Sequence, residues 1–318
     1  MPKVSVIMNC LNCSKYLREA INSVYAQTYN DWEIIFWDNA STDNSAEIAK
    51  TYDEKLRYFR SQETVPLGKA RNLAIEKAGS DYIAFLDCDD LWLSQKLEKQ
   101  IKLVEESNIG LIFSNTIFFY DNGKEYPYIT KSPSKKDFFG YLINNYCISM
   151  DTAIVSKKAI ESVGGFDESL HLMEDADLFM RIAHDFNIEY IHETLSRYRK
   201  HGGSDTFTKT RLFLEEWLYI KKKFTTIYPD FIKTYKKQIQ QRDAREYLIL
   251  GLRKWKEKSK KEAIQYLIEL VRIDIKYLPV FCILLFPSSF YEVLQRIYFL
   301  SKRPETPEVS NSGMNGLP

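Results

Sequence analysis

The sequence is poor in several residue types that would mark a special class of protein. It has 318 residues but only five cysteines, an odd number scattered along a long chain, so no disulfide framework is indicated. Its 12 glycines and 10 prolines exclude a collagen-like chain. The longest apolar run near the end, 277–286, contains Pro279 and is too short to span a bilayer.

The sequence also shows no targeting signal. Its beginning, MPKVSVIMNC, lacks a charged segment followed by an apolar run and a small-residue cleavage site. The pattern is instead typical of a buried strand. We therefore expect a cytoplasmic protein.

What the sequence does have is a composition that supports a large core. It is 45% hydrophobic, 14% aromatic and 27% charged, which excludes an intrinsically disordered chain. The net charge is only +1, but it is unevenly distributed. Residues 1–208 hold 23 Lys and Arg against 31 Asp and Glu, whereas residues 209–303 hold 21 against 10. An acidic front and a basic back predict two parts with different roles.

The first 110 residues alternate between strand-like and helix-like patterns. Apolar runs at 4–8, 33–37 and 81–86 predict buried strands, and residues such as Leu17, Ile21 and Val24 recur at helical spacing between them. This alternation predicts an α/β fold with a mostly parallel sheet and helices on both faces. Asn122-Gly123 predicts a hairpin, and after Gly203 the pattern becomes entirely helical up to about residue 301.

The strongest local signal is a run of acidic residues that follows the predicted strand at 81–86. Asp87, Asp89 and Asp90 lie within four residues, where their charges repel by roughly 1 kcal/mol per close pair. Ligands bind at the carboxyl ends of strands in open α/β sheets, and carboxylates suit Mg²⁺ or Mn²⁺. The motif indicates a divalent metal site. An acidic turn that caps the next helix is the alternative.

A second acidic group precedes a predicted helix at 177–185. Glu174, Asp175 and Asp177 could stabilise the start of that helix, which would account for one or two of them. A general base near a metal site would account for the others. The sequence leaves both readings open.

Four further features each have a structural and a functional interpretation. Asp38 ends a buried strand and could accept hydrogen bonds from a ligand or cap a helix, while Asn9 could face a ligand or shape a turn. Arg71 could reach an anionic ligand or lie solvated at the surface. His201 stands beside glycines, where a structural role is the usual case. A thioredoxin-like redox role for Cys10-x-x-Cys13 is disfavoured, because it would leave the acidic groups without a purpose.

Taken together, these pieces resemble the bacterial-type family 2 glycosyltransferases, which have a GT-A fold. The resemblance covers about residues 3–205. The matching stretches are 4–45, 68–100, 163–183 and 198–204. The resemblance implies a Rossmann-like, mostly parallel central sheet with flanking helices, followed here by a smaller helical region. It also implies transfer of a sugar from a nucleotide sugar, with inversion at the anomeric carbon. Among nucleotide sugars, a UDP-sugar is the first expectation.

The resemblance also implies roles for single residues. Asp38 corresponds to the carboxylate that binds the nucleotide base, and Arg71 to a donor contact. Asp87 and Asp89 form the DxD element, with Asp87 near the ribose and Asp89 on the metal, Mn²⁺ or Mg²⁺. Asp175, with Glu174 beside it, corresponds to the base that deprotonates the acceptor hydroxyl, and His201 to a contact of the metal or the diphosphate. The acceptor would be a glycan or a polyprenyl-linked saccharide.

We expect three parts along the chain: a catalytic domain at 1–205, a basic α-helical domain at 206–303 and a disordered tail at 304–318. Basic clusters beside the short apolar segment at 281–286 suit an anionic membrane surface. This predicts peripheral attachment at the cytoplasmic face of the plasma membrane. Packing on the catalytic domain or an oligomer interface is the alternative, and nucleic-acid binding is not expected, because no recognised module accompanies the charge.

Two other functions compete with a transferase. A haloacid-dehalogenase-type phosphatase also places Asp-x-Asp after a buried strand, but its motif continues with small residues where this sequence has Leu91-Trp92. A sugar- or nucleotide-binding module without turnover is the alternative outside catalysis. Loss of activity with retained donor binding in Asp175→Asn would distinguish a transferase from such a module.

Overall fold

The computed structural model describes residues 2–106, 109–129, 133, 137–201 and 210–284. The chain forms two compact units, Met1–Arg242 and Asp243–Pro318. The division falls within a helix, α10 (Lys236–Lys256), whereas the sequence predicted the end of the catalytic domain at residue 205. The expected disordered tail at 304–318 lies outside the described residues.

One mixed sheet organises the first unit. Its strands lie in the order β3-β2-β1-β4-β8-β6-β9-β5, and β7 pairs with β6 at the side. The strands are β1 (Val4–Cys10), β2 (Trp32–Asp38), β3 (Leu56–Arg60), β4 (Tyr82–Phe85), β5 (Leu91–Trp92), β6 (Ile109–Tyr120), β7 (Glu125–Pro127), β8 (Ile154–Ser156) and β9 (Asn187–Lys200). The first four strands are parallel, as is the β6–β9 pair, whereas β5, β7 and β8 pair antiparallel with their neighbours.

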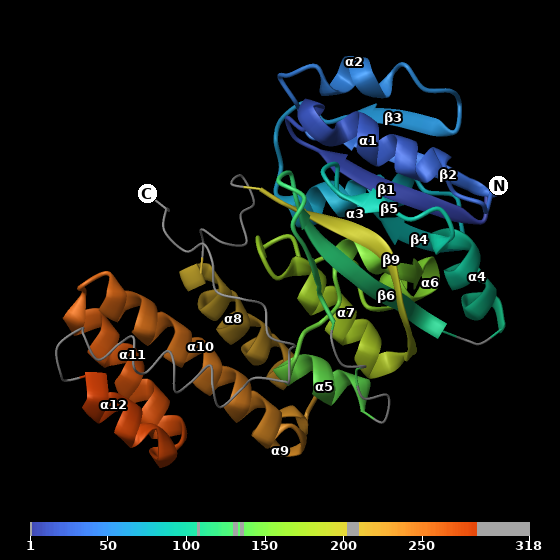
Figure 1. Cartoon of the computed structure of the whole chain (residues 1–318). Helices are drawn as coiled ribbons and strands as arrows, with labels where there is room; N and C mark the ends of the chain where they lie inside the picture. Colours follow the sequence, from blue (N-terminus) through green and yellow to red (C-terminus); the bar gives the residue numbers. More distant parts are fainter. Residues whose placement is uncertain (1, 107–108, 130–132, 134–136, 202–209, 285–318) are drawn as a thin grey trace. The chain divides into compact units, whose positions relative to one another are not determined.

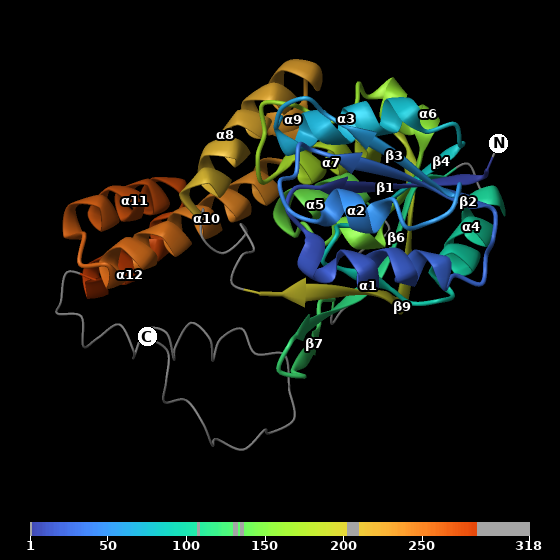
Figure 2. The same cartoon turned by 90° about the horizontal axis from the view of Figure 1, so that it is seen from above.

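Helices cover both faces of this sheet. Figure 2 shows α1 on one side of the sheet and α3, α6 and α7 on the other. The helices of the first group are α1 (Ser14–Tyr25), α2 (Ser45–Ala49) and α4 (Lys96–Glu106), and those of the second are α3 (Leu67–Lys77), α6 (Lys157–Ser162) and α7 (Glu174–Asp185). The predicted α/β arrangement is therefore confirmed.

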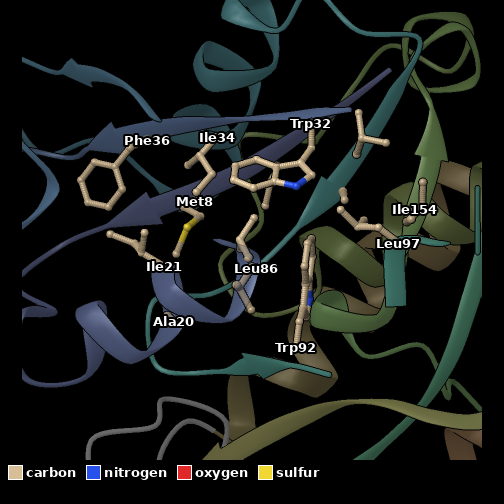
Figure 3. Close-up of a cluster of buried hydrophobic side chains, with 14 of the residues drawn as sticks. Met8, Ala20, Ile21, Trp32, Ile34, Phe36, Leu86, Trp92, Leu97 and Ile154 are labelled. Atoms are coloured by element: carbon tan, nitrogen blue, oxygen red, sulfur yellow. The ribbon is translucent and has the colours of Figure 1, made fainter. Parts of the chain in front are cut away.

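The core on the α1 side follows directly from the alternation of side chains along the strands. Every second residue of β1 and β2 points toward α1, because successive side chains of a strand face opposite ways. Figure 3 shows Met8, Ile34 and Phe36 packed near Ala20 and Ile21, and all five are fully buried.

The strand ends gather the predicted ligand-binding residues. Cys10 at the end of β1 pairs in register with Asp38 at the end of β2, and Ile7 pairs with Phe85 at the end of β4. Parallel strands bring their carboxyl ends to one edge of the sheet. The loop that carries Asp87 therefore starts beside the loops that follow β1 and β2.

Two long strands extend the sheet toward this edge. β9 runs parallel to β6 along most of its length, as Figure 1 shows, with register shifts around Asn115. β9 ends at Lys200 and so delivers Arg199 and His201 to the edge where β4 ends. β6 and β7 form the hairpin that Asn122-Gly123 predicted, with Gly123 at a φ of 81°.

Helices after β9 belong to the first unit as well. α8 (Thr210–Ile227) and α9 (Phe231–Thr234) bury Trp217, Phe224 and Phe231. The rings of Phe224 and Phe231 lie 5.9 and 6.1 Å from that of Phe139 in α5 (Phe138–Asn144). Part of the segment that the sequence assigned to a basic domain therefore completes the core of the first unit.

The second unit is a small helical assembly. The rest of α10 packs on α11 (Lys260–Ile273), which is followed by a 3₁₀ turn (Ile275–Tyr277) and α12 (Leu278–Leu284). Its core consists of Ala244, Leu248, Trp255, Ala263, Leu267 and Leu270. Within the described ranges, no helix has both the length and the apolar composition that crossing a bilayer requires.

Candidate active site

The acidic loop after β4 places its carboxylates in different environments. Asp90 is 1% exposed and accepts a hydrogen bond from the Arg199 backbone N–H at 2.8 Å. Burial, reinforced by the nearby Asp151, raises the pKa of Asp90 well above its usual range. Burial also raises the pKa of Asp87. Asp90 is therefore a buried structural group.

Asp89 is partly exposed to solvent and lies beside a second potential metal ligand, the imidazole of His201. Its side chain is 34% exposed, and its Oδ2 lies 2.8 Å from Nε2 of His201. The His201 ring lies 5.5 Å from the ring of Tyr16 in α1. A carboxylate oxygen and an imidazole nitrogen at this distance form a donor set that Mn²⁺ accepts, and their partial exposure leaves room for further ligands.

Arg71 joins the acidic loop to the start of α7. Its guanidinium is 4% exposed, with Nη1 2.6 Å from Glu174 Oε1 and Nη2 3.3 Å from Asp87 Oδ1. Arg71 is therefore not a solvated surface residue, which was one of its two sequence-based interpretations, because it is buried and paired with two carboxylates. The second oxygen of Glu174, Oε2, is buried and has no hydrogen-bond partner among the described residues.

Asp175 lies in the first turn of α7, and its acidity is strongly altered. Burial, reinforced by the neighbouring Glu174, raises its pKa to about 7, although Arg71 and a hydrogen bond act in the opposite direction. That bond is donated by the Tyr146 hydroxyl to Oδ2 at 2.9 Å. A carboxylate with a pKa near neutrality is suited to general-base catalysis.

All three carboxylates of the acidic group lie in the first turn of α7, where negative charge favours the helix. Asp177, however, is bonded elsewhere. It forms an ion pair with Arg181 and another with Lys223 of α8, where Nζ lies 2.9 Å from Oδ2. Asp177 therefore fixes α7 to α8, which leaves Glu174 and Asp175 for the site.

A buried glutamate of α8 holds the segment just before Glu174. The two carboxylate oxygens of Glu216 accept hydrogen bonds from the backbone N–H groups of His171, Leu172 and Met173 at 2.7, 3.0 and 2.9 Å. Glu216 is 5% exposed. Sequence reasoning missed it, because nothing in the pattern of α8 distinguishes this glutamate from its exposed neighbour Glu215.

Arg199 is a second residue that sequence reasoning missed. It is 5% exposed, and its Nε donates to the backbone carbonyl of Asp89 at 2.9 Å. It also forms ion pairs with Glu19 of α1 and Asp121 of the hairpin, at 2.7 and 3.1 Å. Arg199 thus fixes the acidic loop to three other elements. Its position next to His201 in the stretch 198–204 was the available signal.

The remaining predicted residues lie at the ends of β1 and β2. Asp38 is fully buried, and its carboxylate accepts hydrogen bonds from the Ser41 backbone N–H, the Tyr58 hydroxyl and the Arg60 guanidinium at 2.7, 2.6 and 2.5 Å. Asn9 contributes a buried Nδ2 that lacks an acceptor in the described part of the chain. Most of the predicted residues therefore lie at one edge of the sheet or at the start of α7, and Arg71 reaches both from α3.

Comparisons with known proteins point to one family. The profile of "Glycosyl transferase family 2" matches residues 5–164. An uncharacterized glycosyltransferase of Rickettsia felis is 35% identical over 209 residues, which is 64% of this chain but only 34% of that protein. The Escherichia coli protein WfgD, a UDP-Glc:alpha-D-GlcNAc-diphosphoundecaprenol beta-1,3-glucosyltransferase, is 28% identical over 67% of this chain and 83% of its own length.

Solved structures show the same fold. TarS 1–349 of S. aureus, in complex with UDP-GlcNAc, superposes with a TM-score of 0.58 at 18% identity, covering 87% of this chain and 92% of that one. The mannosyltransferase PcManGT from Pyrobaculum calidifontis, in complex with GDP-Man and Mn²⁺, gives a TM-score of 0.60 at 15% identity, covering 94% and 85%. The fold of the first unit is accordingly GT-A, and the chain belongs to glycosyl transferase family 2.

Proposed function

We propose that the protein is a metal-dependent, inverting hexosyltransferase that uses a nucleoside diphosphate sugar. Among such donors, we propose a UDP-sugar first. The observation that carries this proposal is the chain of contacts from Asp175 through Glu174 and Arg71 to Asp87. In this proposal Asp175, whose pKa is raised to about 7, is the base, and it lies close to the residues that the family resemblance assigns to the donor. The acceptor is a hydroxyl of a glycan or of a lipid-linked saccharide, the acceptor class that the name of WfgD describes.

The family resemblance assigns the donor side to the strand ends. Asp38 would meet the nucleotide base once a ligand displaces one of the three donors on its carboxylate. The unsatisfied Nδ2 of Asn9 would be a further donor, and Asp87 would meet the ribose. Asp89 and His201 would hold Mn²⁺ or Mg²⁺, which would neutralise charge on the departing diphosphate. The Mn²⁺ named for PcManGT is consistent with such a site.

The acceptor side depends on Asp175. As an anion, its carboxylate takes the proton of the acceptor hydroxyl while the oxygen forms a bond to the anomeric carbon and the bond to the diphosphate breaks. One displacement of this kind inverts the anomeric configuration. The Tyr146 hydroxyl orients the carboxylate, and Arg71 balances the charge of Glu174 beside it.

Donor binding should depend on both a metal and Asp89. UDP with Mn²⁺ should raise the melting temperature of the wild type more than GDP, dTDP or CMP does, because the nucleotide that binds most tightly stabilises the native state most. A ligand at about 100 times its Kd stabilises it by about 2.7 kcal/mol. Asp89→Asn should lose the Mn²⁺-dependent part of this shift in a thermal-shift assay. Asp81→Asn, at an exposed carboxylate on the other end of β4, is the control. Equal shifts with and without Mn²⁺ would contradict the metal site.

Turnover should follow the ionisation of Asp175. With saturating donor, kcat should rise with pH and level off above the folded-state pKa of about 7, because only the anion can accept the proton. Tyr146→Phe removes a hydrogen bond that lowers this pKa, so the rise should move to higher pH. Tyr141→Phe, a nearby substitution without that bond, should leave the profile in place. A wild-type kcat independent of pH between 5 and 9 would count against Asp175 as the base.

Glu216 should act as a positioning residue for Asp175. Glu216→Gln leaves one acceptor oxygen for three N–H donors, so the segment 171–173 should loosen and the start of α7 should shift. A displacement of about 1 Å can lower kcat by about 100-fold, while the KM for the donor should hardly change. Glu215→Gln, one residue earlier and exposed, is the matched control. Equal effects of the two substitutions in steady-state kinetics would refute the positioning role.

We further propose that the basic second unit attaches the protein peripherally to the cytoplasmic face of the plasma membrane, where a lipid-linked acceptor would lie. Ile275, Leu278 and Ile268 are 68%, 42% and 37% exposed on this unit. Lysines such as Lys256 and Lys261 lie exposed on the same unit. Exposed apolar side chains beside cationic ones bind anionic lipid surfaces.

Vesicle binding tests this attachment. The protein should co-sediment with vesicles rich in phosphatidylserine and not with purely phosphatidylcholine vesicles, and the double variant Lys256→Glu, Lys261→Glu should bind less. Each lysine near an anionic surface contributes about 1 kcal/mol. The control is Lys102→Glu, Lys158→Glu, which makes the same charge change at exposed sites of the first unit. The same binding by both double variants would exclude the second unit as the contact.

A further inference from the structure

Three cysteines meet at the edge of the sheet next to the acidic loop. Cys10 ends β1, Cys13 directly precedes α1, and Cys88 lies between Asp87 and Asp89. Their sulfur atoms all lie within 4.8 Å of one another. Cys10 and Cys88 are 1% and 2% exposed, whereas Cys13 is half-buried.

The fold brings the third cysteine to the other two. Cys10 and Cys13 are close in sequence, but Cys88 joins them only because β4 pairs with β1, with Ile7 opposite Phe85. The left-handed conformation of Asn12, at a φ of 57°, turns the chain between Cys10 and Cys13. A strand end, a helix start and the acidic loop therefore supply the three thiols.

The oxygen atoms next to these sulfur atoms are weak partners. Cys88 Sγ lies 3.3 Å from the carbonyl oxygen of Asn9, Cys13 Sγ 3.5 Å from that of Leu11, and Cys10 Sγ 3.7 Å from the hydroxyl of Ser41. A thiol is a weak hydrogen-bond donor, so these contacts contribute little. None of them would prevent the sulfur atoms from binding a metal ion.

The spacing fits one thiophilic ion. A Zn–S bond is about 2.3 Å long, which places three sulfur ligands of one ion about 4 Å apart. The three sulfur atoms here are within 4.8 Å of each other, so shifts of less than about 1 Å would bring them to that spacing. Such shifts are within the reach of side-chain rotation at the half-buried Cys13.

We propose that Cys10, Cys13 and Cys88 form a binding site for one thiophilic metal ion, such as Zn²⁺, that is separate from the oxygen and nitrogen ligands at Asp89. Soft sulfur ligands select Zn²⁺ or Cu⁺, whereas carboxylates select Mg²⁺ and Mn²⁺, so the two neighbouring sites would hold different ions. Each thiol that binds releases its proton to solvent. The inference does not depend on the transferase reaction.

A bound ion would connect the acidic loop to the start of α1. Cys88 is one residue from both Asp87 and Asp89, so a metal–sulfur bond at Cys88 restrains the backbone of both. Binding to the native state alone also raises the melting temperature. The site would therefore stabilise the edge of the sheet where the strands end.

Cobalt substitution tests the site on the full-length protein. The reduced, metal-free protein should bind one equivalent of Co²⁺ with a sulfur-to-cobalt charge-transfer band, and Zn²⁺ should displace it. Cys13→Ser and Cys88→Ser should weaken binding by about tenfold or more and reduce the band. The double variant Cys147→Ser, Cys282→Ser removes the two other cysteines of the chain and should keep the band. Asp89→Asn should keep it as well.

Several results would overturn the proposal. One is a reduced wild type that shows no charge-transfer band although a thiol reagent finds its cysteines free. Another is an unchanged band in Cys13→Ser, and a third is loss of the band in the Cys147, Cys282 double variant. If Cys88→Ser fails to fold, as circular dichroism would show, Cys13→Ser decides alone, because its side chain is half-exposed and tolerates the change.

Discussion

The site depends on one buried arginine. The Arg71 guanidinium lies between Glu174 and Asp87 and so connects α3, the loop after β4 and the start of α7. Burying a charge costs several kcal/mol unless partners of opposite charge neutralise it. Here the two carboxylates neutralise the guanidinium, and the guanidinium neutralises them. Loss of Arg71 would leave the buried Glu174 and the partly exposed Asp87 without this counter-charge. Asp87 and Glu174 therefore hold their places through the same cation.

This constraint also explains the acidity of Asp175. Arg71 by itself favours the anion of Asp175, but its charge is already shared with Glu174 and Asp87. Burial and the negative charge of Glu174 outweigh it, and the pKa of Asp175 rises to about 7. The same arginine that stabilises two neighbouring carboxylates leaves the third able to exchange a proton near neutral pH.

Sequence patterns predicted the parts of the molecule whose partners lie nearby in the chain. β1, β2 and β4 are continuous apolar runs because both of their faces are buried, and the acidic groups follow directly from their positions next to strand and helix ends. β9 escaped prediction because its charged and apolar residues alternate irregularly. The contacts of Arg199, Glu216 and Cys88 depend on elements 40 or more residues away in the sequence. Glu216, for example, accepts a hydrogen bond from Met173, 43 residues earlier. A single sequence carries no pattern for such pairs.

Burial assigns different tasks to carboxylates that look equivalent in the sequence. In the run from Asp87 to Asp90, Asp90 is enclosed and its pKa lies well above its usual range, so it serves as a structural acceptor for the Arg199 backbone. Asp87 is held by Arg71. Asp89 alone combines solvent exposure with a neighbouring imidazole. The charge repulsion that made this run conspicuous is therefore smaller in the folded protein than three neighbouring carboxylates indicate, because burial favours the protonated form of Asp90 and Asp87 is paired with Arg71.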